Sequence, residues 1–104
     1  MSSFDEREQT FERKYQNDQE FAFKVRARGT KIAGRWAAAL LGKEGAEADA
    51  YVAGVVNQLA SQGDENVIAR LAKDLAVKGI DRHRVAAELE KARRHAKIEL
   101  GAPK

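Results

Sequence analysis

The chain has 104 residues, of which 43% are hydrophobic, enough for one domain with a modest core. It carries a formal charge of +3 and has no cysteine, which excludes disulfides, thiol chemistry and iron–sulfur ligation. Its single proline and abundant Ala, Leu, Glu, Lys and Arg favour helices, so we expect an all-α protein. No stretch approaches the roughly 18 apolar residues that span a bilayer, and the polar, acidic start predicts a soluble, cytoplasmic protein.

Residues 1–17 are predicted to form a charged helical arm with a narrow aromatic seam. At about 100° per residue, Phe4, Phe11 and Tyr15 fall within roughly 40° of one another. Such a seam is too thin to seed a core but suits docking of a helix in a partner's groove. A helix of about 14 residues is marginal in water, so the arm is expected to be helical or partly disordered. The alternative is that the three rings pack on the rest of the chain.

The charge of the chain changes where this arm ends. Residues 1–20 contain six acids and three bases, whereas residues 21–43 contain six bases and no acid. Asn17 or Asp18 can supply a second helix N-cap, which predicts a kink between the arm and the next helix. That kink could act as a hinge.

The next helix is expected to run to about Leu41 and to stop at Gly42, and it is the longest element of the chain. Its apolar face would hold Phe21, Val25, Ile32, Trp36 and Leu40. Two glycines inside it each cost about 1 kcal/mol against alanine, which is usually offset by the close approach of another helix. These glycines are Gly29 and Gly34.

Four bases of this helix, Lys24, Arg28, Lys31 and Arg35, follow a 4-3-4 spacing that places them in one stripe beside the apolar face. Such a stripe can bind phosphate or an acidic partner surface. It can equally be a solvated flank whose methylene stems cover the edge of the core.

Three shorter amphipathic helices follow. The first spans Ala46 to Ser61, the second starts at an Asp64 cap and ends before Gly79, and the third starts at an Asp81 cap. Their apolar positions are Ala48, Tyr51, Val52, Val55, Val56 and Leu59, then Val67, Ile68, Leu71 and Leu75, then Val85, Leu89, Ala92 and Ala96. Residues 18–100 are therefore predicted to form a four-helix bundle, with residues 101–104 as a flexible tail.

Residues that could carry chemistry are scarce. His83 and His95 have no partner at zinc-binding spacing, so we expect surface histidines and no metal site. The Ser and Thr residues have no evident base, and neither a GxxxxGK[ST] loop nor a GxGxxG turn occurs. We expect no catalytic residues, no required cofactor and no enzymatic activity.

Several segments together resemble a known family. They are SFDERE near the start, GRWAAALLG in the long helix, GAEADAY after it, and GDENV at the start of the third helix. In this order and spacing they resemble the zeta subunit of the alphaproteobacterial F-type ATP synthase, and the resemblance weakens after about Arg84. It implies a four-helix bundle whose arm enters a catalytic αβ interface of the synthase and blocks ATP hydrolysis.

The resemblance also implies partners and binding residues. The partners are the α and β subunits, with γ as a further candidate, which would place the protein at the inner membrane only through the synthase. Phe4 and Phe11 would be apolar anchors and Tyr15 a lesser one. The register would be set by charge pairing of Asp5, Glu6, Arg7, Glu12, Arg13 and Lys14. Family members are associated with purine nucleotide binding, and ADP or ATP is therefore a candidate ligand to which no residue is assigned.

Two other functions stay open on the sequence. A docking or assembly subunit would bind the synthase through the arm without slowing hydrolysis. A small nucleic-acid-binding protein would use the basic stripe and the segment Arg93–Lys97, but the acidic arm and small net charge disfavour DNA or RNA as a partner.

Overall fold

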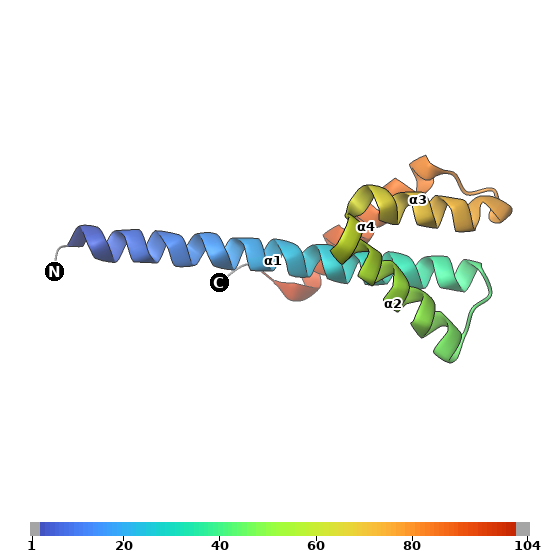
Figure 1. Cartoon of the computed structure of the whole chain (residues 1–104), viewed down its shortest axis with the longest axis horizontal. Helices are drawn as coiled ribbons and strands as arrows, with labels where there is room; N and C mark the ends of the chain where they lie inside the picture. Colours follow the sequence, from blue (N-terminus) through green and yellow to red (C-terminus); the bar gives the residue numbers. More distant parts are fainter. Residues whose placement is uncertain (1–2, 102–104) are drawn as a thin grey trace.

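The computed structural model describes the backbone of residues 3–101 and the side chains of residues 18–101. The described chain is all-α, as expected, and contains no strand. Its helices are α1 (Ser3–Leu40), α2 (Gly45–Gln62), α3 (Asp64–Leu75) and α4 (Arg82–Leu100), and a 3-10 turn, η1 (Ala76–Lys78), follows α3. Figure 1 shows a long α1 that enters a body built with the three shorter helices.

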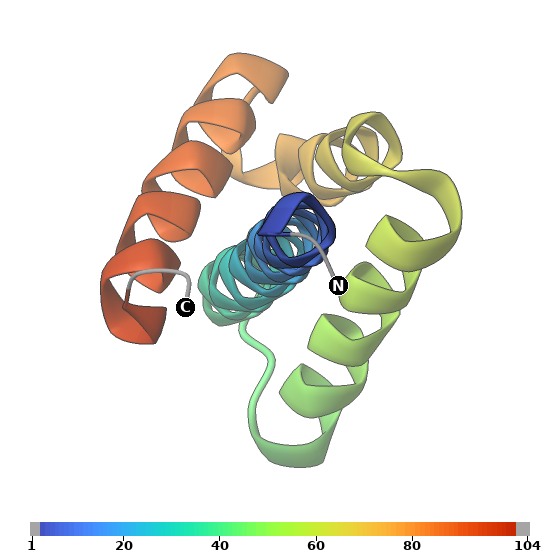
Figure 2. The same ribbon diagram turned by 90° about the vertical axis from the view of Figure 1, so that its left-hand side faces the viewer.

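The α1 helix runs through 38 residues without a break, a length of about 57 Å. The second N-cap that the sequence suggested at Asn17 or Asp18 is therefore wrong, because both positions lie inside α1. A capping side chain needs non-helical backbone at its own position, and here the helix continues. Seen along its length in Figure 2, α1 has α2 on one side and α4 on the other. Its N-terminal half stands clear of them (Figure 1).

The face of α1 that packs most closely in the bundle consists of small residues. Thr30, Ala33, Ala37 and Ala38 are buried. The larger side chains expected on the apolar face are half-buried at its edges, and Leu40 is exposed. Small side chains let the axes of α2 and α4 approach α1, so the larger ones are displaced to the flanks of the contact.

Large apolar side chains of the core come from the three shorter helices. Most of the expected positions are confirmed as buried, and only Ala48 and Val56 of α2 are half-buried without belonging to the core cluster. The buried ones are Val52, Val55 and Leu59 of α2, Val67, Leu71 and Leu75 of α3, and Val85, Leu89, Ala92 and Ala96 of α4. Ile68 and Tyr51 pack partly buried against this cluster. The core therefore lies between α1 and the surrounding three helices, as a bundle requires.

Of the two aspartates expected to cap helices, one does so and the other does not, and the turn before Gly79 differs in type. Asp81 caps α4, since its carboxylate accepts a hydrogen bond of 2.9 Å from the Arg84 backbone N–H. Asp64 makes no cap, because Gly63 is the N-cap of α3 and Asp64 is its first residue. The turn before Gly79 is 3-10 rather than α-helical, and Gly79 then adopts a left-handed conformation.

Candidate functional site

The residues that the sequence assigned to partner binding lie in the arm. The structure describes their backbone as part of α1, but their side chains lie outside the described residues. These residues are Phe4, Asp5, Glu6, Arg7, Phe11, Glu12, Arg13, Lys14 and Tyr15. Where they bind and with which partner stays a prediction.

The basic stripe of α1 is partly neutralised within the chain. Arg28 Nε lies 3.0 Å from a carboxylate oxygen of Glu99 in α4, and Arg35 lies 3.7 Å from Asp49 in α2. Hydrogen bonding to Arg28 is the main cause that lowers the pKa of the Glu99 carboxyl below its usual value. Lys24 forms no ion pair within residues 18–101, and neither does Lys31. Two of the four bases are therefore available to an external acid or anion.

Asp64, the first residue of α3, links this helix to α1 and α4. Its carboxylate accepts two hydrogen bonds from the Arg93 guanidinium of α4, at 2.9 and 2.7 Å, and one from Arg26 of α1 at 3.3 Å. The bonds from Arg93 are the largest cause that lowers the pKa of this carboxyl, against the opposing effect of partial burial. This bidentate pair fixes the start of α3 against α4 and α1.

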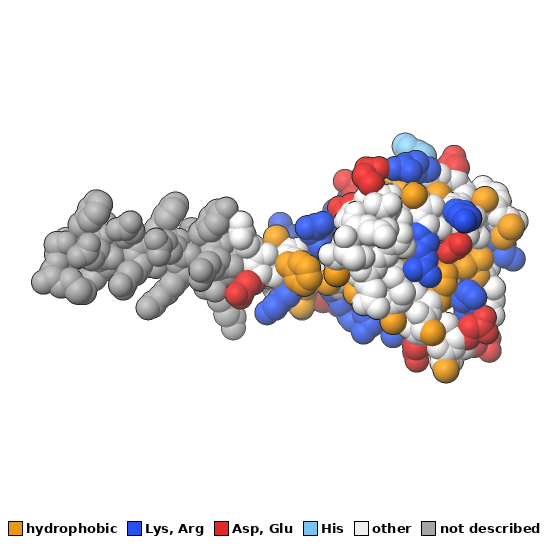
Figure 3. All heavy atoms as spheres, viewed as in Figure 1, with side chains coloured by type: hydrophobic (Ala, Val, Ile, Leu, Met, Phe, Trp, Pro, Cys, Tyr) orange, Lys and Arg blue, Asp and Glu red, His pale blue; other side chains and the backbone are white. Residues whose placement is uncertain are grey.

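Exposed apolar side chains gather where α1 leaves the bundle. Phe23 is 55% exposed, and Ile98 and Leu100, at the end of α4, are 80% and 42% exposed. Figure 3 shows hydrophobic and basic side chains together at this level, next to the part of α1 that is drawn in grey. We call Phe23, Lys24, Ile98 and Leu100 the neck.

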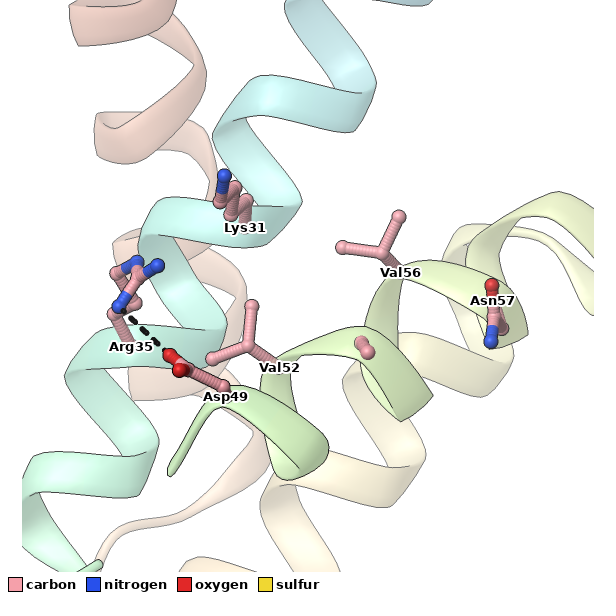
Figure 4. Close-up of a pocket in the computed structure, with 7 residues that line it drawn as sticks. Lys31, Arg35, Asp49, Val52, Val56 and Asn57 are labelled. Atoms are coloured by element: carbon pink, nitrogen blue, oxygen red, sulfur yellow. Dashed lines mark ion pairs between the residues drawn. The ribbon is translucent and has the colours of Figure 1, made fainter. Parts of the chain in front are cut away.

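An open pocket lies between α1 and α2, with a volume of about 480 Å³ (Figure 4). Lys31 and Arg35 line it from α1, and Val52 and Val56 line it from α2. Asp49 also stands at this pocket, where it pairs with Arg35. The pocket thus offers a cationic wall, an apolar wall and one carboxylate that competes for the guanidinium.

A polar cluster lies on the other side of α2. The Tyr51 hydroxyl donates a hydrogen bond of 2.7 Å to Asp74 of α3. Arg70 and Lys43 lie 5.3 and 5.6 Å from the centre of the Tyr51 ring, within range of cation–π attraction. Burial, then the bond to Asp74, raises the pKa of the Tyr51 hydroxyl above its usual value. This arrangement fastens α2 to α3.

Neither histidine belongs to a metal site within the described residues, where no group of His, Cys, Asp and Glu could hold an ion. His95 lies 2.9 Å from Glu99 on the surface of α4. A search of the described helices finds none that is long and apolar enough to cross a membrane.

Comparison with known proteins gives one match. The family model described as ATPase inhibitor subunit zeta matches residues 1–99, which is nearly the whole chain. No curated protein and no solved structure matches the chain. The family match covers both the arm and the bundle.

Proposed function

The chain belongs to the ATPase inhibitor subunit zeta family, and on that premise we propose that its N-terminal helix blocks ATP hydrolysis by docking between an α and a β subunit of the F-type ATP synthase. In this role residues 1–17 are the inhibitory arm and residues 18–100 are the body that carries it. Inhibition of this kind needs no catalytic residue, because a helix held between subunits obstructs the closure on which each catalytic cycle depends.

The observation that carries the proposal is the uninterrupted α1. Residues 3–20 of this helix extend for about 27 Å. Figure 1 shows this part standing clear of the other three helices. A long helix with one end in a folded bundle presents the other end at a fixed angle to a groove. A helix whose only role was to complete the bundle would not need to extend this far beyond the other three helices.

The anchoring residues of the proposal are Phe4 and Phe11, with Tyr15 as a lesser anchor. The surrounding charges of the arm would pair with charges on the α and β subunits and set the register, and γ is a further candidate partner. Membrane association would be indirect, through the synthase.

The test is ATP hydrolysis by the cognate catalytic sector prepared without this subunit. It is titrated with the full-length chain, with a protein that lacks residues 1–17, and with the full-length double variant Phe4→Ala/Phe11→Ala, while binding is followed in parallel. A matched control is Val77→Ala, which removes an exposed apolar side chain from η1 in the body. We expect the full-length chain and the Val77→Ala control to inhibit saturably. The protein that lacks residues 1–17 and the double variant should lose most of the inhibition.

The outcomes separate this function from its alternatives. Binding of the full-length chain without inhibition would identify a docking or assembly subunit. Absence of binding would contradict the proposal and return attention to nucleic acid, for which binding with a steep salt dependence is the expected sign.

As a second proposal, we propose that the protein binds a purine nucleotide, ADP or ATP, in the pocket between α1 and α2. Its volume of about 480 Å³ falls in the usual range for small-molecule sites. Lys31 forms no ion pair within residues 18–101 and would meet a phosphate, and Val52 offers an apolar wall to the base. Titration calorimetry with ADP tests it: Lys31→Ala should weaken binding and Asp49→Asn should strengthen it, whereas Lys73→Ala, in α3, should change neither. Equal affinity for ADP in the wild type and in all three variants would mean that the nucleotide binds elsewhere.

A further inference from the structure

We propose that the neck is a second contact with the same partner: it meets an acidic and partly apolar surface at the rim of the groove that takes the arm. This inference rests on the proposed function and adds to it a surface outside the arm. The neck thereby limits how far α1 enters the groove.

The neck contains several exposed apolar side chains and not a single exposed ring. The large hydrophobic side chains exposed among residues 18–101 are Phe23, Leu40, Val77, Ile98 and Leu100. Three of these five belong to the neck. One exposed Phe would need no explanation, but a group of three at one end of a small body is typical of a binding surface.

The register of α1 and α4 brings the parts of the neck to one level. Position 29 of α1 contacts Arg93 of α4. Glu99, nearer the end of α4, pairs with Arg28. The two helices therefore run in opposite directions, and seven residues toward the N-terminus from Gly29 corresponds to seven residues toward the C-terminus from Arg93. On this register Leu100 lies at about the level of residue 22, the same end of the body as Phe23.

The charge of the neck fits an acidic partner. Residues 21–43 contain six bases and no acid. The two arginines nearest the neck already have carboxylate partners within the chain, Asp64 for Arg26 and Glu99 for Arg28. Lys24 is exposed and forms no ion pair with a described residue, although Glu20 lies one helical turn away. An external carboxylate would complete the pairing of Lys24.

Because α1 is continuous, a partner that holds the arm must also lie close to the neck. Residue 23 follows the arm by six residues, a distance of about 9 Å along the helix. A groove that holds the arm must therefore end close to the neck. The end of α4 lies against α1 at this level and widens the body there, so the helix cannot slide further without α4 meeting the rim.

The test uses full-length variants in the hydrolysis titration, with association and dissociation rates measured in parallel. The neck variants are Phe23→Ala/Leu100→Ala and Lys24→Glu. Their matched controls, Val77→Ala and Lys78→Glu, change the same kinds of exposed side chain in η1, at the opposite end of the body (Figure 1). We expect each neck variant to raise the half-inhibitory concentration about tenfold, and each control to leave it unchanged. The effect of Lys24→Glu should shrink as salt is raised.

Four outcomes would contradict this inference, and each has a different meaning. If the wild-type chain inhibits and the neck variants inhibit equally well, the neck is not a contact and the arm alone accounts for the function. If the controls weaken inhibition as much as the neck variants, the specific placement is overturned. Tighter inhibition by Lys24→Glu would overturn the acidic character of the surface. Failure of the wild-type chain to bind would overturn the proposed function, and this inference with it.

Discussion

Gly29 of α1 lies directly against the backbone of Arg93 in α4, so that a Cβ at position 29 would stand 2.9 Å from the Arg93 Cα and 2.5 Å from its Cγ. We predict that Gly29→Ala destabilises the bundle by about 1 to 2 kcal/mol. Alanine gains about 1 kcal/mol in helix propensity, but the overlap with α4 backbone costs more than that gain. The measurement is the midpoint of urea unfolding followed by circular dichroism.

Gly34 is the matched control for this prediction. A Cβ there would lie 3.6 Å from Val52, which is an ordinary van der Waals contact. Gly34→Ala should therefore stabilise the protein by about 0.5 to 1 kcal/mol, the gain in propensity alone. A stability of Gly29→Ala equal to or above that of the wild type would contradict the close approach of α4.

The ion pair of Asp64 with Arg93 predicts a specific acid dependence of stability. The folded state lowers the pKa of the Asp64 carboxyl from its unfolded value of about 3.8, chiefly through the hydrogen bonds from Arg93. Its contribution is therefore present above that unfolded value and is lost as the pH falls through the folded-state pKa. Asp64→Asn should cost about 1 kcal/mol near neutral pH, and its difference from the wild type should vanish in acid.

The control is Asp49→Asn, which breaks a looser pair. Asp49 lies 3.7 Å from Arg35, and its side chain is 69% exposed. Exposed pairs of this kind contribute about 0 to 1 kcal/mol, so this variant should follow the wild-type stability closely across the pH series. A constant difference between Asp64→Asn and the wild type down to the acid limit would show that the charge of Asp64 does not matter.

Tyr51 should resist ionisation in the folded protein. Burial, and then the hydrogen bond to Asp74, raises the pKa of its hydroxyl above the usual value of 10. The chain has two tyrosines, so the variant Tyr15→Phe isolates Tyr51 in an ultraviolet titration. We expect the folded protein to give less phenolate signal at pH 10 than a free tyrosine, and a loss of stability that begins as the pH rises through 10, because the unfolded state then releases the proton first. A Tyr51 titration centred on pH 10 in folded protein would contradict the burial and the bond.

The sequence predicted the packing of the shorter helices better than that of α1. Apolar side chains such as Val67, Leu71 and Val85 stand at helical spacing, and periodicity alone identifies the face they share. In α1 the buried positions include Ala33 and Ala37, which a hydrophobicity pattern weighs less than the large side chains beside them. The two glycines were the signal for this face: the predicted close approach is confirmed at Gly29, whereas at Gly34 the neighbouring Val52 lies at an ordinary van der Waals distance.

Asp64 shows why local rules fail at a site with distant partners. Its place just before an apolar run matches a helix cap, but its carboxylate pairs instead with residues 38 positions before it and 29 positions after it. Spacing along one helix contains no information on such pairs. The same holds for the neck, which forms because the end of α4 returns to α1. The arm, by contrast, was predicted from its aromatic seam and its charge, and its partner from the resemblance to a family; its contacts stay a prediction.

The uninterrupted α1 predicts that a break at the end of the arm weakens inhibition. Proline at position 18 removes a backbone N–H and clashes with the carbonyl one turn earlier, at a cost of about 3 kcal/mol in a helix interior. Asp18 is exposed and precedes the packed part of α1, so the body should keep its unfolding midpoint. We expect Asp18→Pro to raise the half-inhibitory concentration at least tenfold, since the arm then loses the orientation that the bundle gives it. Asp18→Ala removes the same charge without breaking the helix and should inhibit like the wild type. Equal inhibition by the two variants would mean that the arm works as a hinged segment, as the capping residues at 17 and 18 had suggested.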